Sequence, residues 1–394
     1  YFLANRSLPW WAVGLSVMAT QLSAVTLIGT TGQGATDGLR FVQFYFGLPI
    51  AMVLLGVTLV PFLHGAKVYT AYEYLERRFD PKTRSLTSLL FLLSRGMSCG
   101  TIIAAPSVVL SSIFGWDLTW CVALIGVPTV IYTVLGGVQA VAWADVKQMF
   151  VIVGALVALV VVLILRMPIP VDDALRIAGA AGRLQVFDFS FDLSKTYTFW
   201  SGILGGTFLM LSYFGTDQSQ VQRYLAAKSV DEARSSLLMS AYWKIPLQAL
   251  ILLIGVLVFL FYLFQPAPLL YNPRHDAKVQ QDAPAEYAAL QSRYASAIAV
   301  RQSAARSASA AQHSGDAAAA TVALQSFKST ELTVDSIRAD ALAAAARVTG
   351  EASRDVNFII PRFVLDHLPL GFAGVFLAAV LAAAMSSIAA ELNS

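Results

Sequence analysis

The chain has 394 residues, of which 57% are hydrophobic and only 13% are charged. A soluble protein carries about 25% charged residues, so this composition indicates a chain whose apolar surface faces lipid. The net charge of +3 comes without a basic run, and nucleic acid is therefore excluded as an expected partner. We expect an all-α polytopic membrane protein.

The apolar runs are long enough to cross a bilayer several times. A crossing helix needs about 20 predominantly apolar residues. Runs of this kind, numbered here in chain order as spans 1 to 8, cover 10–33, 41–63, 86–113, 117–136, 146–165, 196–219, 237–264 and 370–391. Helix-breaking residues, among them Pro61 and the pair Gly136 and Gly137, fall at or near span ends.

Basic residues indicate the orientation of the spans. Most Lys and Arg of the short loops follow span 2 or span 6, and the loop at 166–195 is a partial exception. Both basic loops fall on one side if every span crosses, and such loops are usually cytoplasmic. We therefore expect span 1 to run outward from the cytoplasm, in a plasma (inner) membrane.

Residues 266–355 differ from the rest because they are rich in Ala, Gln, Ser and charges and contain no crossing run. We expect a transmembrane core at 1–265, an extracytoplasmic helical or partly disordered insert at 266–355, and a continued core at 356–394. The insert could be a decoration without chemistry of its own. Because the chain opens at Tyr1 and stops directly after span 8, it reads as a fragment of a longer protein.

Small and polar residues interrupt two of the spans. In span 1 they cluster between Ser23 and Gly34, and in span 6 between Ser201 and Asp217. Irregular backbone at membrane depth is tolerated only where it lines a site or cavity, and interruptions at matching positions of two opposed repeats point to a binding site. Small residues equally suit close helix packing, so both interpretations stay open.

Ionisable residues inside spans are costly, at about 2.5–3.5 kcal/mol each. The residues concerned are Arg95, Asp145, Asp217 and Lys244. Asp145 could be an interfacial anchor together with Lys147. Arg95 and Lys244 lie deeper, and although their stems could snorkel, we expect them to pair with Asp145, Asp217 or Glu391.

Span 8 carries a serine pair. Ser386 and Ser387 follow Ala383 by three and four residues and so share one helix face with it. A sodium ion wants about five or six oxygens, by analogy with other hard cations. Two hydroxyls and the Ala383 carbonyl could supply three, and the interrupted part of span 1 could add carbonyls. Alternatively, each serine bonds back to its own helix.

Four motifs, in order, carry a resemblance to a known family. They lie at 5–11 with 19–24 and 28–29, at 136–148, at 217–218 with 222–228, and at 383–387. Over nearly the whole chain except the insert, the sequence resembles the sodium:solute symporter family. The resemblance implies a LeuT-like (APC superfamily) 5+5 inverted-repeat helix bundle with broken helices in spans 1 and 6. One leading helix and the helices after span 8 would be absent.

The resemblance also implies a sodium site. Its residues would be the carbonyls of Ala19, Leu22 and Ala383, the hydroxyls of Ser386 and Ser387, and nearby Asp145. Ala389 and Ala390 stand where some members place hydroxyls for a second ion, so a second site is not supported. No cofactor is implied beyond Na⁺ as the coupling ion.

A solute pocket would lie between the interruptions of spans 1 and 6. The candidate contacts are Thr26, Arg95, Ser98, Asp217, Gln218 and Lys244. Family solutes imply a sugar, sialic acid, carboxylate or amino acid, but Val25 and Thr26 replace the polar pair of the galactose carrier. Arg95 and Lys244 could favour an anion, unless Asp217 neutralises one of them.

The expected function is sodium-coupled symport of a small organic solute by alternating access. Its expected partners are the solute and the lipid bilayer, with no obligatory protein partner. The alternatives are a symporter-like sensor module of a signalling protein and a channel, although broken helices favour gated binding over a continuous pore. An enzyme is not expected, because no nucleophile–base pair, metal cluster or phosphate loop appears at usable spacing.

Overall fold

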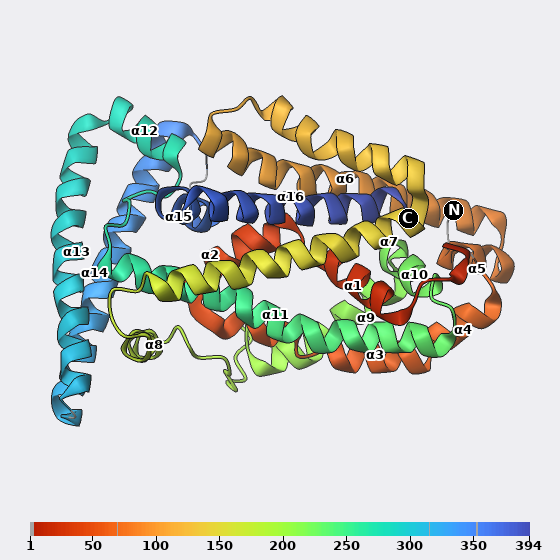
Figure 1. Cartoon of the computed structure of the whole chain (residues 1–394), viewed down its shortest axis with the longest axis horizontal. Coiled ribbons are helices and arrows are strands. Elements are labelled where there is room, and N and C mark those ends of the chain that lie inside the picture. The colour runs from red at the N-terminus through yellow and green to blue at the C-terminus, as the bar shows by residue number, and fades with distance from the viewer. Residues whose placement is uncertain (1–3, 69, 315, 352–353) are drawn as a thin grey trace.

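The computed structural model describes residues 4–68, 70–314, 316–351 and 354–394. Within these ranges regular structure is helical, apart from one isolated bridge between Leu8 and Ala227. Long helices run along the long axis of the molecule, and a helical hairpin lies across one end of this bundle (Figure 1). We call that end the hairpin end, and the opposite end, where α1 begins and α16 finishes, the terminal end.

Spans 1 to 5 fold into the first half of the bundle. Its elements are α1 (Trp10–Gln21), a π-helix (Thr26–Thr30), α2 (Thr31–Asp37), a 3₁₀ helix (Gly38–Tyr45), α3 (Leu48–Val57), α4 (Leu59–Ala66), α5 (Ala71–Arg78), α6 (Pro81–Phe114), α7 (Leu118–Leu165) and α8 (Val171–Ala180).

Spans 6 to 8 and the insert form the second half. Its elements are a π-helix (Ser201–Gly205), α9 (Gly206–Thr216), α10 (Gln218–Leu225), α11 (Val230–Phe264), α12 (Pro273–Asp282), α13 (Pro284–His313), α14 (Ala317–Thr349), a 3₁₀ helix (Val356–Phe358), α15 (Ile359–His367) and α16 (Leu370–Leu392).

Five helical stretches of the described residues are long and apolar enough to cross a membrane: Thr26–Ala66, Pro81–Ser112, Leu118–Leu165, Val230–Phe264 and Leu370–Leu392. They hold all or part of every predicted span except span 6. Span 6 is divided among shorter helices, and the first part of span 1 is a separate helix. The prediction of broken helices in spans 1 and 6 is therefore confirmed.

Spans 4 and 5 both lie in α7 but are separate helical segments. Gly137, with φ 56° and ψ −159°, lies outside the helical region and in a conformation that favours glycine. The two segments run in opposite directions along the bundle (Figure 1). The glycine pair at 136–137 thus ends span 4, as the sequence predicts.

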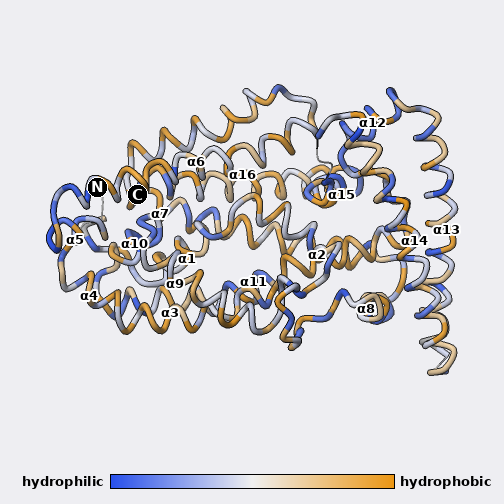
Figure 2. The backbone as a smooth tube through the Cα atoms, turned by 180° about the vertical axis from the view of Figure 1, so that it is seen from behind, coloured by the Kyte–Doolittle hydropathy of each residue, from blue (hydrophilic) through white to orange (hydrophobic). Residues whose placement is uncertain are grey.

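The outside of the bundle is apolar. Leu92, Leu135 and Phe150 are 65%, 81% and 70% exposed, and hydrophobic colouring follows the long helices (Figure 2). An apolar surface of this extent on a soluble monomer would cause association. It suits a bundle that lipid surrounds, which agrees with the predicted membrane protein.

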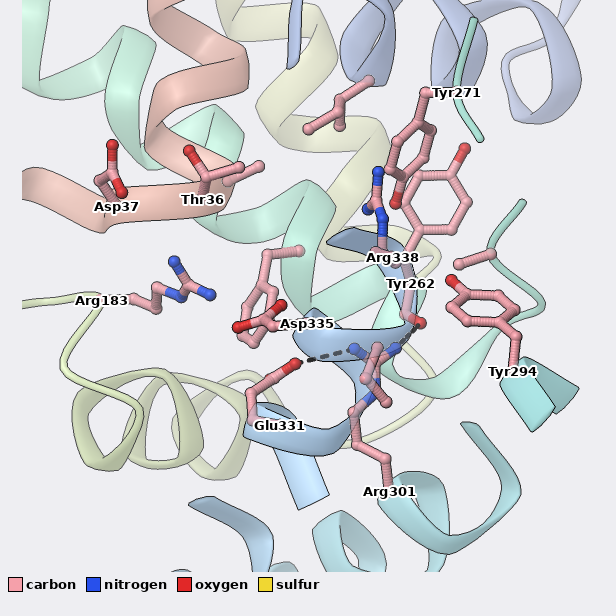
Figure 3. A pocket seen from close by; sticks show the side chains of 15 residues that line it. Thr36, Asp37, Arg183, Tyr262, Tyr271, Tyr294, Arg301, Glu331, Asp335 and Arg338 are labelled. Carbon is pink, nitrogen blue, oxygen red and sulfur yellow. Dashed lines mark hydrogen bonds and ion pairs between the residues drawn. The ribbon is translucent and has the colours of Figure 1, made fainter. Parts of the chain in front are cut away.

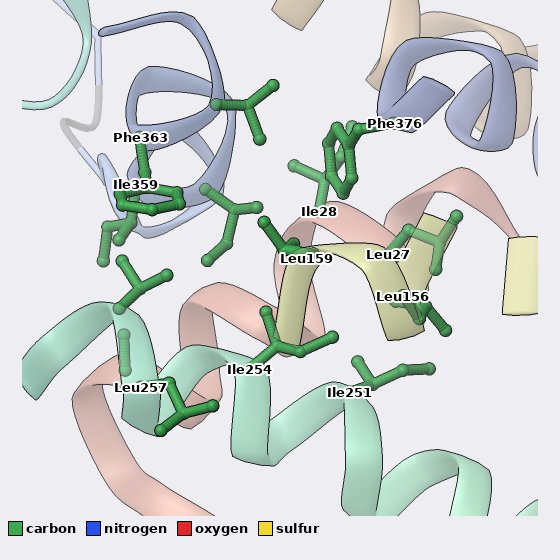
Figure 4. Close-up of a cluster of buried hydrophobic side chains, with 14 of the residues drawn as sticks. Leu27, Ile28, Leu156, Leu159, Ile251, Ile254, Leu257, Ile359, Phe363 and Phe376 are labelled. Carbon is green, nitrogen blue, oxygen red and sulfur yellow. The ribbon is translucent and has the colours of Figure 1, made fainter. Parts of the chain in front are cut away.

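Inside the bundle, one apolar cluster joins both halves of the chain. Leu27 and Ile28 of the first π-helix meet Leu156 of α7, Ile251 of α11 and Phe376 of α16 (Figure 4). Apolar contacts of this kind are so densely packed that a change of one methylene group alters the stability of the core. The cluster holds the interrupted part of span 1 between its neighbours.

The insert forms a helical hairpin. Ala-rich α13 and α14 have high helix propensity, and Asp316 caps α14 by accepting the N–H groups of Ala318 and Ala319 at 3.0 Å. Tyr294 of α13 and Val334 of α14 belong to its own buried cluster. The hairpin lies across the ends of α2 and α11 (Figures 1 and 2).

The close crossing of α2 and α11 yields a stability prediction. A Cβ added at Gly255 of α11 would collide with the Thr31 carbonyl of α2. We expect Gly255→Ala to destabilise the protein by about 1–3 kcal/mol through overpacking. In the control Gly126→Ala, the new Cβ meets open space, and stability should be kept. Thermal unfolding of the purified full-length protein measures both, and equal melting of the two variants would refute the close crossing.

Candidate functional site

Span 1 is interrupted at Leu22 and Ser23, directly after α1. Leu22 has φ −101° and ψ 78°, outside the helical region, and its N–H donates to the Ala19 carbonyl at 3.1 Å. The last carbonyls of α1 consequently lack the amide partners that a continuing helix would supply. The break precedes the glycines of 29–34, which are helical. Gly34 allows close packing against α11. The small and polar residues of span 1 therefore accompany an interruption at Ser23 and a close helix contact at Gly34.

The serine pair of α16 faces the end of α1. The Ser387 hydroxyl lies 3.4 Å from the Thr20 carbonyl and 3.1 Å from the Ala383 carbonyl of its own helix. The Ser386 hydroxyl donates to Asp145 Oδ1 at 2.7 Å. Only Ser387 therefore bonds back to its own helix, and it also reaches across to α1.

Asp145 is fully buried and joins four helices. Besides Ser386 of α16, its carboxylate accepts from Ser16 of α1 at 2.6 Å and from Arg223 Nη1 of α10 at 2.6 Å. Arg223 Nη1 also contacts the Ser16 hydroxyl. Asp145 is thus not an interfacial anchor, because its charge is compensated inside the bundle by a guanidinium.

Lys244 of α11 takes a different partner from those the sequence suggests. Its side chain is buried at 1% exposure, and Nζ donates to the Gln21 carbonyl at 3.3 Å. The ammonium also lies 5.2 Å from the centre of the Tyr45 ring. A cation at the carboxyl end of α1 is favourable because the helix dipole is negative there. The expected pairing with Asp145, Asp217 or Glu391 is wrong.

Span 6 is interrupted at Asp217, which has extended backbone between α9 and α10. Its Oδ1 caps α10 by accepting the Ser219 N–H at 3.0 Å, and its Oδ2 pairs with Arg95 of α6 at 2.8 Å. Arg95 also donates to Glu391 of α16 at 2.7 Å. The expectation that Arg95 pairs with acidic side chains inside the bundle is confirmed.

The remaining solute candidates lie near one or the other interruption. Thr26 approaches Ser23 at the span 1 break, with 3.4 Å between their hydroxyl oxygens. Gln218 Oε1 accepts from the Ala71 N–H at 3.1 Å, and Ser98 lies half-buried on α6 near Arg95. The six candidates therefore divide into Thr26 and Lys244 at the first break and the other four at the second.

Arg223 is the site residue that sequence reasoning missed. By charge pattern it counts among the basic residues that follow span 6, although it falls in the motif at 222–228. Only the fold shows that α10 turns its side chain into the bundle against Asp145. A basic residue one or two turns after a predicted helix break was the available signal.

The oxygen atoms at the span 1 break fit a hard monovalent cation. Carbonyls and hydroxyls are the ligands that hard cations prefer. The described residues contain no group of three or more His, Cys, Asp and Glu side chains placed to hold a metal ion together. Oxygen ligands of this kind suit a hard cation rather than a transition metal.

Comparison with known proteins gives relatives over most of the chain. The model of the "Sodium:solute symporter family" matches residues 1–291. Sodium-coupled monocarboxylate transporter 1 of Xenopus laevis is 33% identical over 240 residues, which are 60% of this chain and 38% of that protein. The human sodium/iodide cotransporter is 30% identical over 262 residues, 66% of this chain and 41% of that protein. The chain spans about two-fifths of the length of these relatives.

A solved structure agrees with the fold. The chain is similar to a Na⁺-coupled sialic acid symporter in its substrate-bound outward-open state, with a TM-score of 0.72 and 23% identity. The likeness covers 100% of this chain and 65% of that chain, and it confirms the LeuT-like fold class. Since the family match extends over more than half of its length, the chain belongs to the sodium:solute symporter family.

Proposed function

We propose that the protein performs sodium-coupled symport of a small organic solute by alternating access. The observation that carries the proposal is the carbonyl end of α1 facing the serine pair of α16, with Asp145 beside it. The sodium-coupled relatives support the same function.

In the proposed site, one sodium ion is held by the carbonyls of Ala19, Leu22 and Ala383 and by the hydroxyls of Ser386 and Ser387. The Ser387 hydroxyl lies 3.1 Å from the Ala383 carbonyl of its own helix and 3.4 Å from the carbonyl of Thr20, the residue that follows Ala19 in α1. Asp145 would act through Ser386, because it accepts the hydrogen of that hydroxyl and leaves the oxygen lone pairs to face the ion. Five oxygens match the needs of a small hard cation, about six being usual.

The ion would couple to the solute by fixing α1 against α16. A cation at the carboxyl end of α1 compensates the negative end of the helix dipole, and its departure would release α1 from its neighbour. Sodium and solute affinities would then be reciprocally linked. A membrane potential adds about 2.3 kcal/mol per charge per 100 mV to inward movement.

We infer that the terminal end faces the cytoplasm and the hairpin end the outside of a plasma membrane. The basic loop that holds α5 lies at the terminal end (Figure 1), where positive residues are expected. The core at 1–265 and 356–394 would then span the bilayer, and the insert at 266–355 would lie outside it.

The solute contacts are proposed between the two interruptions. Arg95 is shared by the carboxylates of Asp217 and Glu391, so two acidic side chains already engage the guanidinium of this group. It is therefore a poor anion site, and we propose that it holds the broken helices in place. Lys244 remains the cationic candidate, and Thr26, Ser98 and Gln218 remain the neutral ones.

Transport itself can be tested in proteoliposomes that contain the full-length protein. We expect labelled lactate, alanine or sialic acid to accumulate above its equilibrium level when sodium is higher outside. The sodium gradient supplies the free energy for that accumulation. A matched potassium gradient is the control, and equal uptake under both gradients would rule out sodium coupling.

The sodium site is tested by Ser387→Ala. Loss of one oxygen ligand should raise the sodium concentration for half-maximal uptake by about tenfold, equivalent to roughly 1.4 kcal/mol. The matched control is Ser240→Ala, since Ser240 is fully buried but its hydroxyl donates only to the Leu237 carbonyl of its own helix. If both variants keep the wild-type sodium dependence, the assigned site is wrong.

The buried pair of Asp145 and Arg223 gives a further prediction. Arg223→Gln should destabilise the protein by about 3–5 kcal/mol, because it leaves Asp145 charged and unpaired in the bundle. Adding Asp145→Asn should recover much of that loss. The pair of Arg362 and Asp366, whose side chains are 32% and 40% exposed, is the control, and breaking it should cost less than about 1 kcal/mol. Thermal unfolding measures each change, and additive effects of the two buried substitutions would contradict the pairing.

A further inference from the structure

A cavity of about 300 Å³ lies at the hairpin end of the bundle. Its walls come from the end of α2, the loop after α8, α11, and the hairpin helices α13 and α14 (Figure 3). No residue of the proposed sodium site lines it. The volume falls at the lower end of the range for small-molecule sites, about 300–1,000 Å³.

One wall of the cavity holds a buried ion pair with spare hydrogen-bonding capacity. Arg301 Nη1 of α13 pairs with Glu331 Oε1 of α14 at 2.9 Å, and the two side chains are 7% and 11% exposed. Arg301 Nη2 donates to the Tyr262 carbonyl at 3.0 Å. Arg301 Nε and Glu331 Oε2 are buried and have no partner. Buried polar atoms are normally hydrogen-bonded, so this wall is built to receive a ligand or water.

A second arginine faces this pair from the bundle side. The Arg183 guanidinium lies 4.7 Å from the centre of the Phe259 ring, and its buried Nε has no partner. Within the described part of the chain Arg183 makes no ion pair. Its side chain points across the cavity toward Asp335 and Glu331 (Figure 3). Arg183 therefore brings a guanidinium without an ion-pair partner to a cavity that is also lined by the carboxylates of Glu331 and Asp335.

We propose that this cavity is a binding site for a small carboxylate that also carries hydroxyl groups. The ligand carboxylate accepts hydrogen bonds from Arg183 and Arg301, and a ligand hydroxyl donates to Glu331 Oε2. The carbon skeleton lies against the rings of Phe259 and Tyr271, which line the cavity.

Both functional groups of the ligand are needed. A simple carboxylate leaves the Glu331 oxygen unpaired, and a neutral polyol leaves the arginine N–H groups without an anion. Sites built to hydrogen-bond a group reject analogues that lack it. The site goes beyond the proposed symport, since it depends on the hairpin and not on the sodium ligands.

The test is calorimetric titration of the purified full-length protein with three six-carbon probes in sodium-free choline buffer. Gluconate has a carboxylate and hydroxyls, glucitol has only hydroxyls, and hexanoate has only the carboxylate. We expect gluconate to bind, and the other two to bind at least about tenfold more weakly, because each loses charge-assisted or hydroxyl hydrogen bonds. Absence of gluconate binding, equal binding of all three, or binding that requires sodium would overturn the proposal.

Two variants test whether the ligand binds in this cavity. Arg183→Gln removes a charge without leaving a buried partner unpaired, and Glu331→Gln keeps an oxygen for Arg301. Each should weaken gluconate binding by about tenfold or more. The matched control is Arg293→Gln on α13, whose pair with Asp340 is 57% and 50% exposed, and it should bind gluconate as the wild type does. Wild-type affinity in both cavity variants would overturn the proposal.

Discussion

A helix that ends inside an apolar bundle leaves main-chain carbonyls that water cannot reach. Here α1 ends at Gln21, and its last three carbonyls take the Leu22 N–H, the Ser387 hydroxyl and the Lys244 ammonium as partners. These partners come from the break itself, α16 and α11. The interrupted helix is thus stabilised by groups from both halves of the chain.

Charge compensation connects the two broken spans to the rest of the bundle. Asp145 and Arg223 tie α7 to α10, and Arg95 ties α6 to the break at Asp217. Each contact lies inside the bundle, where burying a charge is costly. Loss of one partner is therefore expected to lower the free energy of unfolding by more than the intact pair contributes to it. Such contacts hold the broken spans in one arrangement relative to their neighbours.

Much of this could be predicted from the sequence, because the strongest constraints of a membrane are local. Apolar runs fix the spans, Gly137 ends span 4, and polar residues mark the two interruptions. The chain breaks at Leu22 rather than among the glycines, and Gly34 instead packs closely against α11, which is a long-range contact. The inward turn of Arg223 and the cavity under the hairpin are likewise long-range, and no periodicity encodes them.

The sodium site can be observed in a structure of the full-length protein determined in sodium, at a resolution that shows ions. We expect density for one ion between the end of α1 and the serine pair of α16, with oxygens at about 2.3–2.6 Å as for other hard cations of similar size. An ion found elsewhere, with α1 and α16 separated and Ser387 turned back to its own helix alone, would contradict that expectation.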